Sequence, residues 1–258
     1  MKYLSSCSIV KNEYPYIFEF IKIHRALGIE HFLFFDRSDD PLQNHLGGEK
    51  DITIINYPEP NRHASAWMEG IKFYLGKSQF VQFIDIDQVL FPTKHTDLRV
   101  MLKENYDNCP AVGFNWHSFG SNNFKIEPNN STYEDFTARA EGNCPINNHI
   151  QTIAKPELIE QVMWADPHHP PMKNYQCQLN EYKKFIPYNS PFNIPPSQDF
   201  CFIAHYFTRS KQYWSNKIKK MRADTGTSGG TMEDFDHHQT YMNAVQDTRI
   251  ADFYKSIK

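Results

Sequence analysis

The residues with the clearest chemical potential are two aspartates, Asp85 and Asp87, which end the apolar part of FVQFIDIDQVLFP (80–92). In an extended chain, residues i and i+2 point to one side, so the two carboxylates can converge. Such a pair is repulsive unless a cation lies beside it, and Mg²⁺ or Mn²⁺ prefers oxygen ligands of this kind. The pair predicts a metal site that offsets charge on a phosphate-bearing leaving group. An inert, solvated strand end is the alternative interpretation.

The elements that would position this pair alternate between strand and helix patterns. Strand patterns cover 4–10, 31–35, 52–55 and 80–84, and helical patterns cover 11–28 and about 65–75. This alternation is typical of βαβ units and a parallel sheet, in which ligands bind beyond the carboxyl ends of the strands. Polar residues follow three of these strands, namely Lys11, Asn12 and Glu13, then Asp36, then Asp85 and Asp87. Asn12 also suits the N-cap of the first helix.

The remainder of the chain has clear elements and one long polar stretch. We expect a helix from Thr96 or Asp97 through Leu102, a strand at 111–116, a strand-like run at 199–207 and a basic helix from 209. The stretch 120–148 is rich in Asn, Ser and Gly, which is typical of a functional lid, a binding loop or a disordered segment. The tail after 233 has partly helical character.

Composition narrows the classes of function. The chain has 258 residues and a formal net charge of −3, so one domain is expected and no basic excess points to nucleic acid. No apolar run reaches the length of a transmembrane helix. Five scattered cysteines without a CxxC pair favour free thiols. We therefore expect a cytoplasmic, bacterial protein whose contact with a membrane would be peripheral, through the basic helix at 209–220.

Two classes of enzyme use aspartates in this arrangement. HAD-type phosphatases carry a DxDx(T/V) strand in which the first Asp is the nucleophile, together with a later Lys and an acidic pair. Lys155 or Lys173, with Asp234 and Asp236, would be the candidates here, but three strands precede the motif instead of following it. Nucleotide-sugar transferases of the GT-A fold instead place DxD after the fourth strand of a Rossmann-like half, which agrees with the order in this chain.

Five segments in order strengthen the second interpretation. They are 8–40 (SIVKNEYPYIF…FFDRSDD), 83–92 (FIDIDQVLFP), 114–123 (FNWHSFGSNN), 133–140 (YEDFTARA) and 203–220 (IAHYFTRSKQYWSNKIKK). Together they resemble glycosyltransferase family 92 and family 2-like proteins over about residues 4–220. Two positions depart from the pattern: Gln88 stands where Glu is commoner, and Asp135 replaces a basic residue.

The resemblance implies an α/β GT-A fold, with a mostly parallel central sheet flanked by helices in a single domain. The nucleotide-binding half would be about 1–95, the acceptor half 96–222 and the tail 223–258. The implied reaction moves a sugar from a nucleotide-diphosphate donor, most simply a UDP-sugar, to a hydroxyl of a glycan or lipid-linked glycan, with Mn²⁺ or Mg²⁺ and inversion. A degenerate GT-A domain that only binds glycans is the non-enzymatic alternative.

The resemblance also suggests roles for individual residues. The metal ligands would be Asp85, Asp87 and His205. The donor would contact Lys11, Asn12, Glu13, Asp36, Arg62, His63, Asp85, Arg209 and Lys211, with Lys217 as a further cation near the diphosphate. The acceptor would meet Trp116, Phe119, Gly120 and Ser121.

An inverting transfer also needs a base for the acceptor hydroxyl. Glu134 is the candidate, and its rivals are Glu127, Asp135, Asp166 and His168. The histidine pairs 168–169 and 237–238 are expected at the surface.

Overall fold

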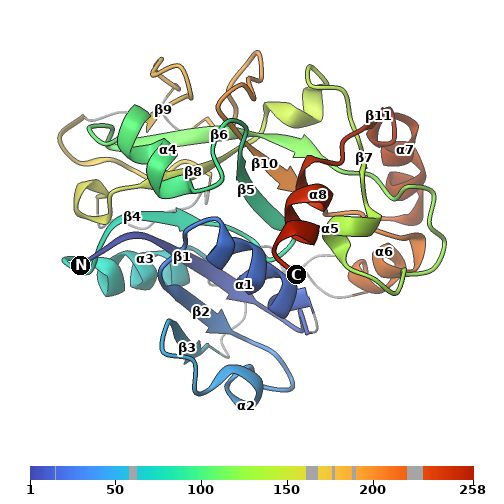
Figure 1. Ribbon diagram of the computed structural model, residues 1–258, viewed down its shortest axis with the longest axis horizontal. Coiled ribbons are helices and arrows are strands. Elements are labelled where there is room, and N and C mark those ends of the chain that lie inside the picture. Colours follow the sequence, from blue (N-terminus) through green and yellow to red (C-terminus); the bar gives the residue numbers. More distant parts are fainter. Residues whose placement is uncertain (15, 58–62, 161–167, 176–177, 188–189, 220–228) are drawn as a thin grey trace.

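The protein folds around one central sheet (Figure 1). The computed structural model describes residues 1–14, 16–57, 63–160, 168–175, 178–187, 190–219 and 229–258. Within these residues the sheet has nine strands in the order β3-β2-β1-β4-β8-β6-β10-β5, with β9 paired to β6. Parallel pairs outnumber antiparallel ones, so the predicted α/β class with a mostly parallel sheet is confirmed.

The N-terminal part of the sheet is wholly parallel, as the alternating sequence pattern predicts. Its strands are β1 (Lys2–Val10), β2 (Phe32–Asp36), β3 (Ile52–Asn56) and β4 (Ser78–Phe83). The connecting helices are α1 (Tyr16–Ala26), α2 (Gln43–Leu46) and α3 (His63–Tyr74). The N-cap prediction for Asn12 is wrong, because α1 begins four residues later. Asn12 instead has a φ of 56°, and its side chain bonds to Asp39.

The second part of the sheet turns several strand ends towards Asp85 and Asp87. It contains β5 (Gln88–Pro92), β6 (Ala111–Ser118), β8 (Ile150–Ala154), β9 (Gln178–Leu179) and β10 (Cys201–His205). Strand β8 runs antiparallel to both β4 and β6, so β4 and β6 run in the same direction. Strand β10 is parallel to β6. The carboxyl ends of β1, β4, β6 and β10 therefore meet at one edge.

The remaining elements lie outside the central sheet. They are α4 (Leu98–Asn105), α5 (Thr132–Asp135), β7 (Ala138–Arg139), α6 (Lys211–Lys217), α7 (Met232–Met242), β11 (Val245–Gln246) and α8 (Arg249–Ser256), with short 3₁₀ turns at Pro145–Asn148, Pro156–Leu158 and Lys173–Tyr175. Asp97 caps α4 as expected, since its carboxylate accepts the Arg99 N–H at 2.8 Å. The polar stretch 120–148 contains α5, β7 and the 3₁₀ turn Pro145–Asn148, and β7 pairs with β11 of the tail.

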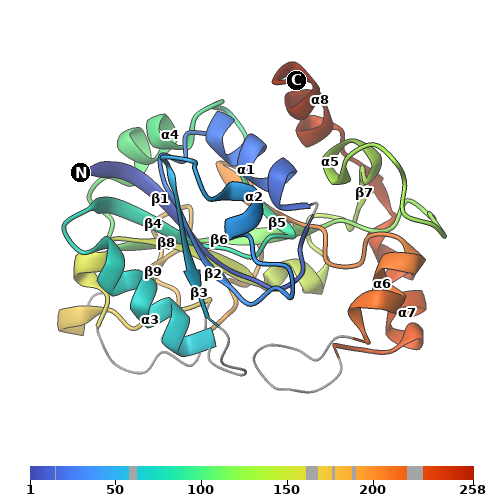
Figure 2. The ribbon, with the colours of Figure 1, turned by 90° about the horizontal axis from the view of Figure 1, so that it is seen from below.

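Helices cover both faces of the sheet. Figure 2 shows α1 and α4 on one face and α3 on the other. Apolar residues of α1, α4 and α8 share one buried cluster, to which Phe20, Leu98 and Ile250 contribute. Trp67 and Ile71 of α3 belong to a second cluster. The tail is therefore part of the main core, because burial of Ile250 and Tyr254 removes their apolar surface from water.

Helix α3 lies close to β1 because of a glycine. A Cβ atom built on Gly70 would lie 2.5 Å from the Sγ atom of Cys7, which is fully buried. No real Cβ contact is this short, so a larger residue would push α3 away from the sheet. Gly70 thus fixes the spacing of one helix layer.

This close contact makes Gly70 sensitive to substitution. Gly70→Val should lower the free energy of unfolding by roughly 2 kcal/mol, the usual cost of overpacking a core. Gly48→Val is the matched control, because a Cβ at Gly48 meets nothing within 4 Å. Urea unfolding followed by circular dichroism measures both, and equal effects of the two substitutions would contradict the proposed packing.

Candidate active site

A pocket of 940 Å³ opens where the strands β1, β4, β6 and β10 end. The turn after β4 contributes Asp85 and Asp87 to its lining, and the loop after β1 contributes Lys11 to Tyr14. Trp116 of β6 and His205 of β10 form the opposite side. The carboxyl-end location matches the general position of ligand sites in open α/β sheets.

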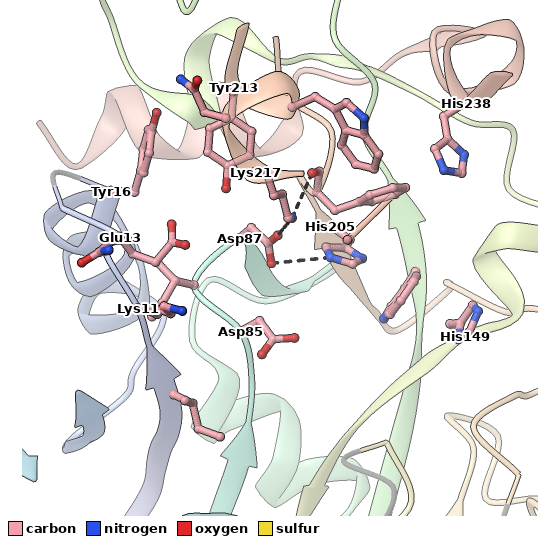
Figure 3. A pocket seen from close by; sticks show the side chains of 18 of the residues that line it. Lys11, Glu13, Tyr16, Asp85, Asp87, His149, His205, Tyr213, Lys217 and His238 are labelled. Carbon is pink, nitrogen blue, oxygen red and sulfur yellow. Dashed lines mark hydrogen bonds and ion pairs between the residues drawn. The ribbon is translucent and has the colours of Figure 1, made fainter. Parts of the chain in front are cut away.

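Asp87 is the most constrained side chain in this pocket. Its Oδ2 atom accepts a hydrogen bond from Lys217 Nζ at 2.8 Å, and its Oδ1 atom lies 3.5 Å from His205 Nε2 (Figure 3). Its side chain is only 13% exposed. Burial alone would raise the pKa of Asp87, but Lys217 and His205 hold it well below its usual value. Asp87 is therefore an anion at neutral pH, held between two nitrogen donors.

Asp85 is oriented by the neighbouring glutamine. Gln88 lies buried in β5, and its Nε2 atom donates to Asp85 Oδ2 at 3.3 Å. Its Oε1 atom accepts the backbone N–H of Asp85 at 3.4 Å. A glutamate at position 88 would bring a second negative charge to this carboxylate, whereas the neutral amide provides both a donor and an acceptor. Gln88, which stands where Glu is commoner, therefore still orients Asp85 through two hydrogen bonds.

Two tyrosines form the wall beside α1 and α6. Tyr16 and Tyr213 line the pocket with ring centroids 5.7 Å apart, and the guanidinium of Arg209 lies behind them, 3.8 Å and 4.6 Å from the two centroids. Arg209 is 1% exposed. Burial alone would lower the pKa of this guanidinium, but Tyr213, Glu13 and other neighbours hold it above its usual value. Arg209 therefore supports an aromatic wall through cation–π contacts.

The opposite side of the pocket combines tryptophan and histidines. The Trp116 ring stacks on His149 at 4.5 Å and meets His205 edge-on at 4.3 Å. Burial lowers the pKa of His149 to about 4, and the neighbouring His168 and His205 add to the effect. His149 is thus neutral at pH 7, and this side offers an aromatic surface with little charge.

His168 has a defined tautomer. Its Nδ1 atom lies 2.8 Å from the Ile150 carbonyl oxygen and 2.9 Å from Gln151 Oε1, and both of these atoms are acceptors. Gln151 is itself fixed, because its Nε2 atom donates to the Phe83 carbonyl at 2.5 Å. The proton of neutral His168 therefore resides on Nδ1, and Nε2 is the basic atom of the ring.

The structure brings together many of the sequence-predicted residues, but not all of them. Those lining the pocket are Lys11, Asn12, Glu13, Asp85, Asp87, Trp116, His168, His205 and Lys217. Those outside its described lining are Asp36, Phe119, Gly120, Ser121, Glu134, Arg209 and Lys211. Arg62 and Asp166 lie outside the described residues, as does the side chain of His63.

The predicted base does not lie in the pocket. Glu134 of α5 pairs instead with Lys258 Nζ at 2.6 Å. Two of its rivals are also committed elsewhere, since Glu127 accepts from Tyr16 and Ser210 and Asp135 accepts from Asn130. Among the described candidates only His168 lines the pocket.

Two predicted donor contacts serve other purposes. Asp36 is 4% exposed, and its carboxylate accepts the backbone N–H groups of Ser38 at 3.0 Å and Leu42 at 2.7 Å, so it organises the loop after β2. Lys211 forms an exposed ion pair with Asp236 at 3.2 Å. Arg209 is buried and Lys217 lines the pocket, so neither of these two charges of the basic segment lies on an open surface.

The predicted acceptor segment packs in the core behind Trp116. Phe119 stacks on Tyr206 at a centroid distance of 4.6 Å. A Cβ on Gly120 would lie 2.6 Å from the carbonyl oxygen of Met242 at the end of α7. The Ser121 N–H donates to Gln239 of the same helix. This segment therefore fixes α7, whose own residues reach the pocket.

Sequence reasoning missed several lining residues. They are Tyr16 and Tyr213 of the aromatic wall, Trp214 of α6, His149 beside Trp116, and His238 and Tyr241 of α7. The surface prediction for the histidine pairs is wrong for three of four residues, because His168 and His238 line the pocket and His169 is buried. Among these residues, a usable signal in the sequence exists only for Tyr213 and Trp214, which are aromatic residues within the predicted basic helix.

The donor chemistry of the pocket suits a hard cation, because Asp85 and Asp87 both offer carboxylate oxygens. No group of three His, Cys, Asp or Glu that could hold a metal occurs in the described part of the chain. His205 points its Nε2 atom at Asp87, as a hydrogen-bonding partner would. Two carboxylates on one pocket nevertheless fit Mg²⁺ or Mn²⁺, which commonly complete their shell with phosphate oxygens and water.

The residues that a phosphatase would need lie elsewhere. Lys155 donates to the Asp107 carbonyl and Lys173 to the Glu157 carbonyl. Asp234 belongs to the capping box of α7. None of these, nor Asp236, is among the described residues that line the pocket. The predicted phosphatase constellation is therefore not assembled around Asp85 and Asp87.

The low pKa of His149 gives a testable pH dependence. Its pKa falls from 6.5 to about 4 on folding, so stability is fully present above pH 6.5 and is lost as the pH falls towards 4. His149→Gln should therefore reduce the drop in melting temperature between pH 7 and pH 5. His237→Gln, at an exposed position of α7, is the control. An unchanged drop in the His149 variant would contradict neutral burial of this imidazole.

Comparison with known proteins identifies relatives of this chain. The family model described as glycosyltransferase family 92 matches residues 4–223. Family 92 proteins of Ricinus communis and Arabidopsis thaliana are 21% and 24% identical over 69% and 64% of this chain. A family 92 protein of Oryza sativa is 24% identical over 78%. The chain spans only 32%, 31% and 32% of the length of these three relatives.

Solved structures show weaker likeness. A 4-diphosphocytidyl-2C-methyl-D-erythritol synthase of Anaerococcus prevotii is 17% identical, with a TM-score of 0.36, over 61% of this chain and 73% of its own. TarS of S. aureus is 10% identical, with a TM-score of 0.38, over 93% of this chain and 42% of its own.

None of the helices in the described residues combines the length and apolar character that a membrane span requires. The family match covers most of the chain and includes the turn after β4 that carries Asp85 and Asp87. This chain belongs to glycosyltransferase family 92.

Proposed function

We propose that this protein transfers a sugar from a nucleotide-diphosphate donor, most simply a UDP-sugar, to a hydroxyl of a glycan or lipid-linked glycan. The observation that carries the proposal is the position of Asp85 and Asp87, which line one pocket at the carboxyl end of β4. The pocket lies between an aromatic wall and a side rich in tryptophan and histidine, and this division suits two substrates.

The donor would lie beside β1 and α6. Tyr16 and Tyr213 offer ring faces and edges to a nucleobase, and Glu13 offers a carboxylate to its N–H or to a ribose hydroxyl. The Lys11 and Lys217 ammonium groups are the described cations that line the pocket, and they would face the diphosphate. Asp85 and Asp87 would hold Mg²⁺ or Mn²⁺, which supplies charge neutralisation of the leaving diphosphate.

The acceptor would lie against Trp116 and His149. Aromatic rings bind the apolar C–H faces of sugars, and the neutral imidazole of His149 adds no charge there. In an inverting transfer the acceptor oxygen bonds to the anomeric carbon as the bond to the diphosphate breaks. The acceptor proton then needs a base, and we propose His168, which Gln151 and the Ile150 carbonyl orient.

Nucleotide binding provides a direct test. UDP with Mn²⁺, with their complex near 100-fold above its dissociation constant, should raise the melting temperature by about 5–10 °C, because only the folded chain binds it. Asp87→Asn should remove most of this shift. Asp236→Asn is the matched control, since Asp236 forms an exposed ion pair on α7 outside the pocket.

A panel of nucleotide sugars, scored for donor hydrolysis with Mn²⁺, would then identify the donor. Hydrolysis of an aryl phosphate together with trapping of fluoroberyllate would contradict the proposal in favour of a phosphatase. Oligosaccharide binding without any response to nucleotides would indicate a glycan-binding domain that has lost catalysis.

A further inference from the structure

Lys217 ties together three segments around Asp87. Its Nζ atom donates to Asp87 Oδ2 at 2.8 Å and to the carbonyl of Phe207 at 3.0 Å. The backbone carbonyl of Asp87 accepts the Tyr206 N–H at 2.8 Å, so the turn after β4 is also fixed to the end of β10. Figure 3 shows the Lys217 ammonium directly over the Asp87 carboxylate. A cation from the chain thus already stands at the carboxylate that a metal ion would use.

The net charge of the pocket affects how a metal ion and a diphosphate would bind beside the Lys217–Asp87 ion pair. Its described lining contains three carboxylates, Glu13, Asp85 and Asp87, against two lysines, Lys11 and Lys217, a formal charge of −1 with neutral histidines. A diphosphate entering alone would meet this negative excess. A divalent ion entering alone would have to displace Lys217 from Asp87. Each ligand therefore lowers the cost of binding the other.

We propose that Lys217 is a gate on Asp87, which excludes a divalent cation until a nucleoside diphosphate enters and takes over the Lys217 ammonium. The inference rests on the proposed donor binding and adds an order to it. Lys217 would exchange one oxygen acceptor, on Asp87, for another on the diphosphate, so no charge is left unpaired. By linkage, the nucleotide then tightens metal binding by the same factor as the metal tightens nucleotide binding.

The position of Lys217 allows such an exchange. It is the last residue of α6, and its side chain is 34% exposed, compared with 13% for Asp87. A lysine carries its charge on a flexible stem with rotatable N–H donors, so the ammonium can move over a short distance while the backbone stays in place. Asp87 has no comparable freedom, because β10 holds its backbone and His205 faces its other oxygen.

Manganese binding without nucleotide tests the gate, with electron paramagnetic resonance of free Mn²⁺ as the readout. Lys217→Gln should bind Mn²⁺ at least about tenfold more tightly than the natural chain, because a charged hydrogen bond no longer competes for Asp87. Lys211→Gln is the matched control, since it removes the same charge from the same helix but lies outside the pocket, paired with Asp236. Equal or weaker Mn²⁺ binding by a folded Lys217→Gln variant overturns the proposal.

The natural chain gives a second measurement that does not depend on the variant. UDP should tighten Mn²⁺ binding about tenfold or more, after correction for the Mn–UDP complex in solution, whereas uridine should leave it unchanged. Mn²⁺ affinity that is indifferent to UDP, although UDP binds, overturns the gate and leaves the proposed function intact. Failure of UDP to bind with or without Mn²⁺ contradicts the proposed function itself.

Discussion

The structure depends on one electrostatic constraint: a carboxylate that is nearly buried at the end of a sheet strand must be paired with positive charge. Asp87 meets this constraint through Lys217 and His205, which come from segments more than a hundred residues away in the sequence. Breaking such a pair by removing one partner leaves an uncompensated charge, which is strongly unfavourable in a buried site. The requirement therefore links the end of β4 to β10 and α6, and it places a cation beside the position proposed for the diphosphate.

The topology of the sheet makes this pairing possible. Strand β8 lies between β4 and β6 and runs antiparallel to both, so β6 runs in the same direction as β4. Strand β10 is parallel to β6 and therefore shares this direction. Trp116 and His205 therefore reach the same edge as Asp85 and Asp87. The C-terminal tail closes the site, since α8 packs in the main core and α7 contributes His238 and Tyr241 to the lining.

Local patterns were sufficient for the parallel half of the fold and for the residues at its strand ends. Periodicity identified β1 to β4 and α1, and the carboxyl-end rule then placed Lys11, Glu13, Asp85 and Asp87 in one pocket. Asp36 was misassigned although its partners, Ser38 and Leu42, are close in sequence, whereas two other misassigned residues have distant partners. Arg209 was predicted to bind the diphosphate, but Tyr16 and Tyr213 cover its guanidinium. Glu134 was predicted to be the base, but its carboxylate pairs with Lys258 at the end of the chain. Such pairings follow from tertiary packing, which no local motif encodes.

Diffraction at the manganese absorption edge from crystals soaked with UDP and Mn²⁺ tests the central claim most directly. The account predicts an anomalous peak beside Asp87, with the Lys217 ammonium moved from this carboxylate onto a phosphate oxygen. A nucleotide bound in the pocket with Lys217 still on Asp87, and with manganese absent or bound elsewhere, would contradict it.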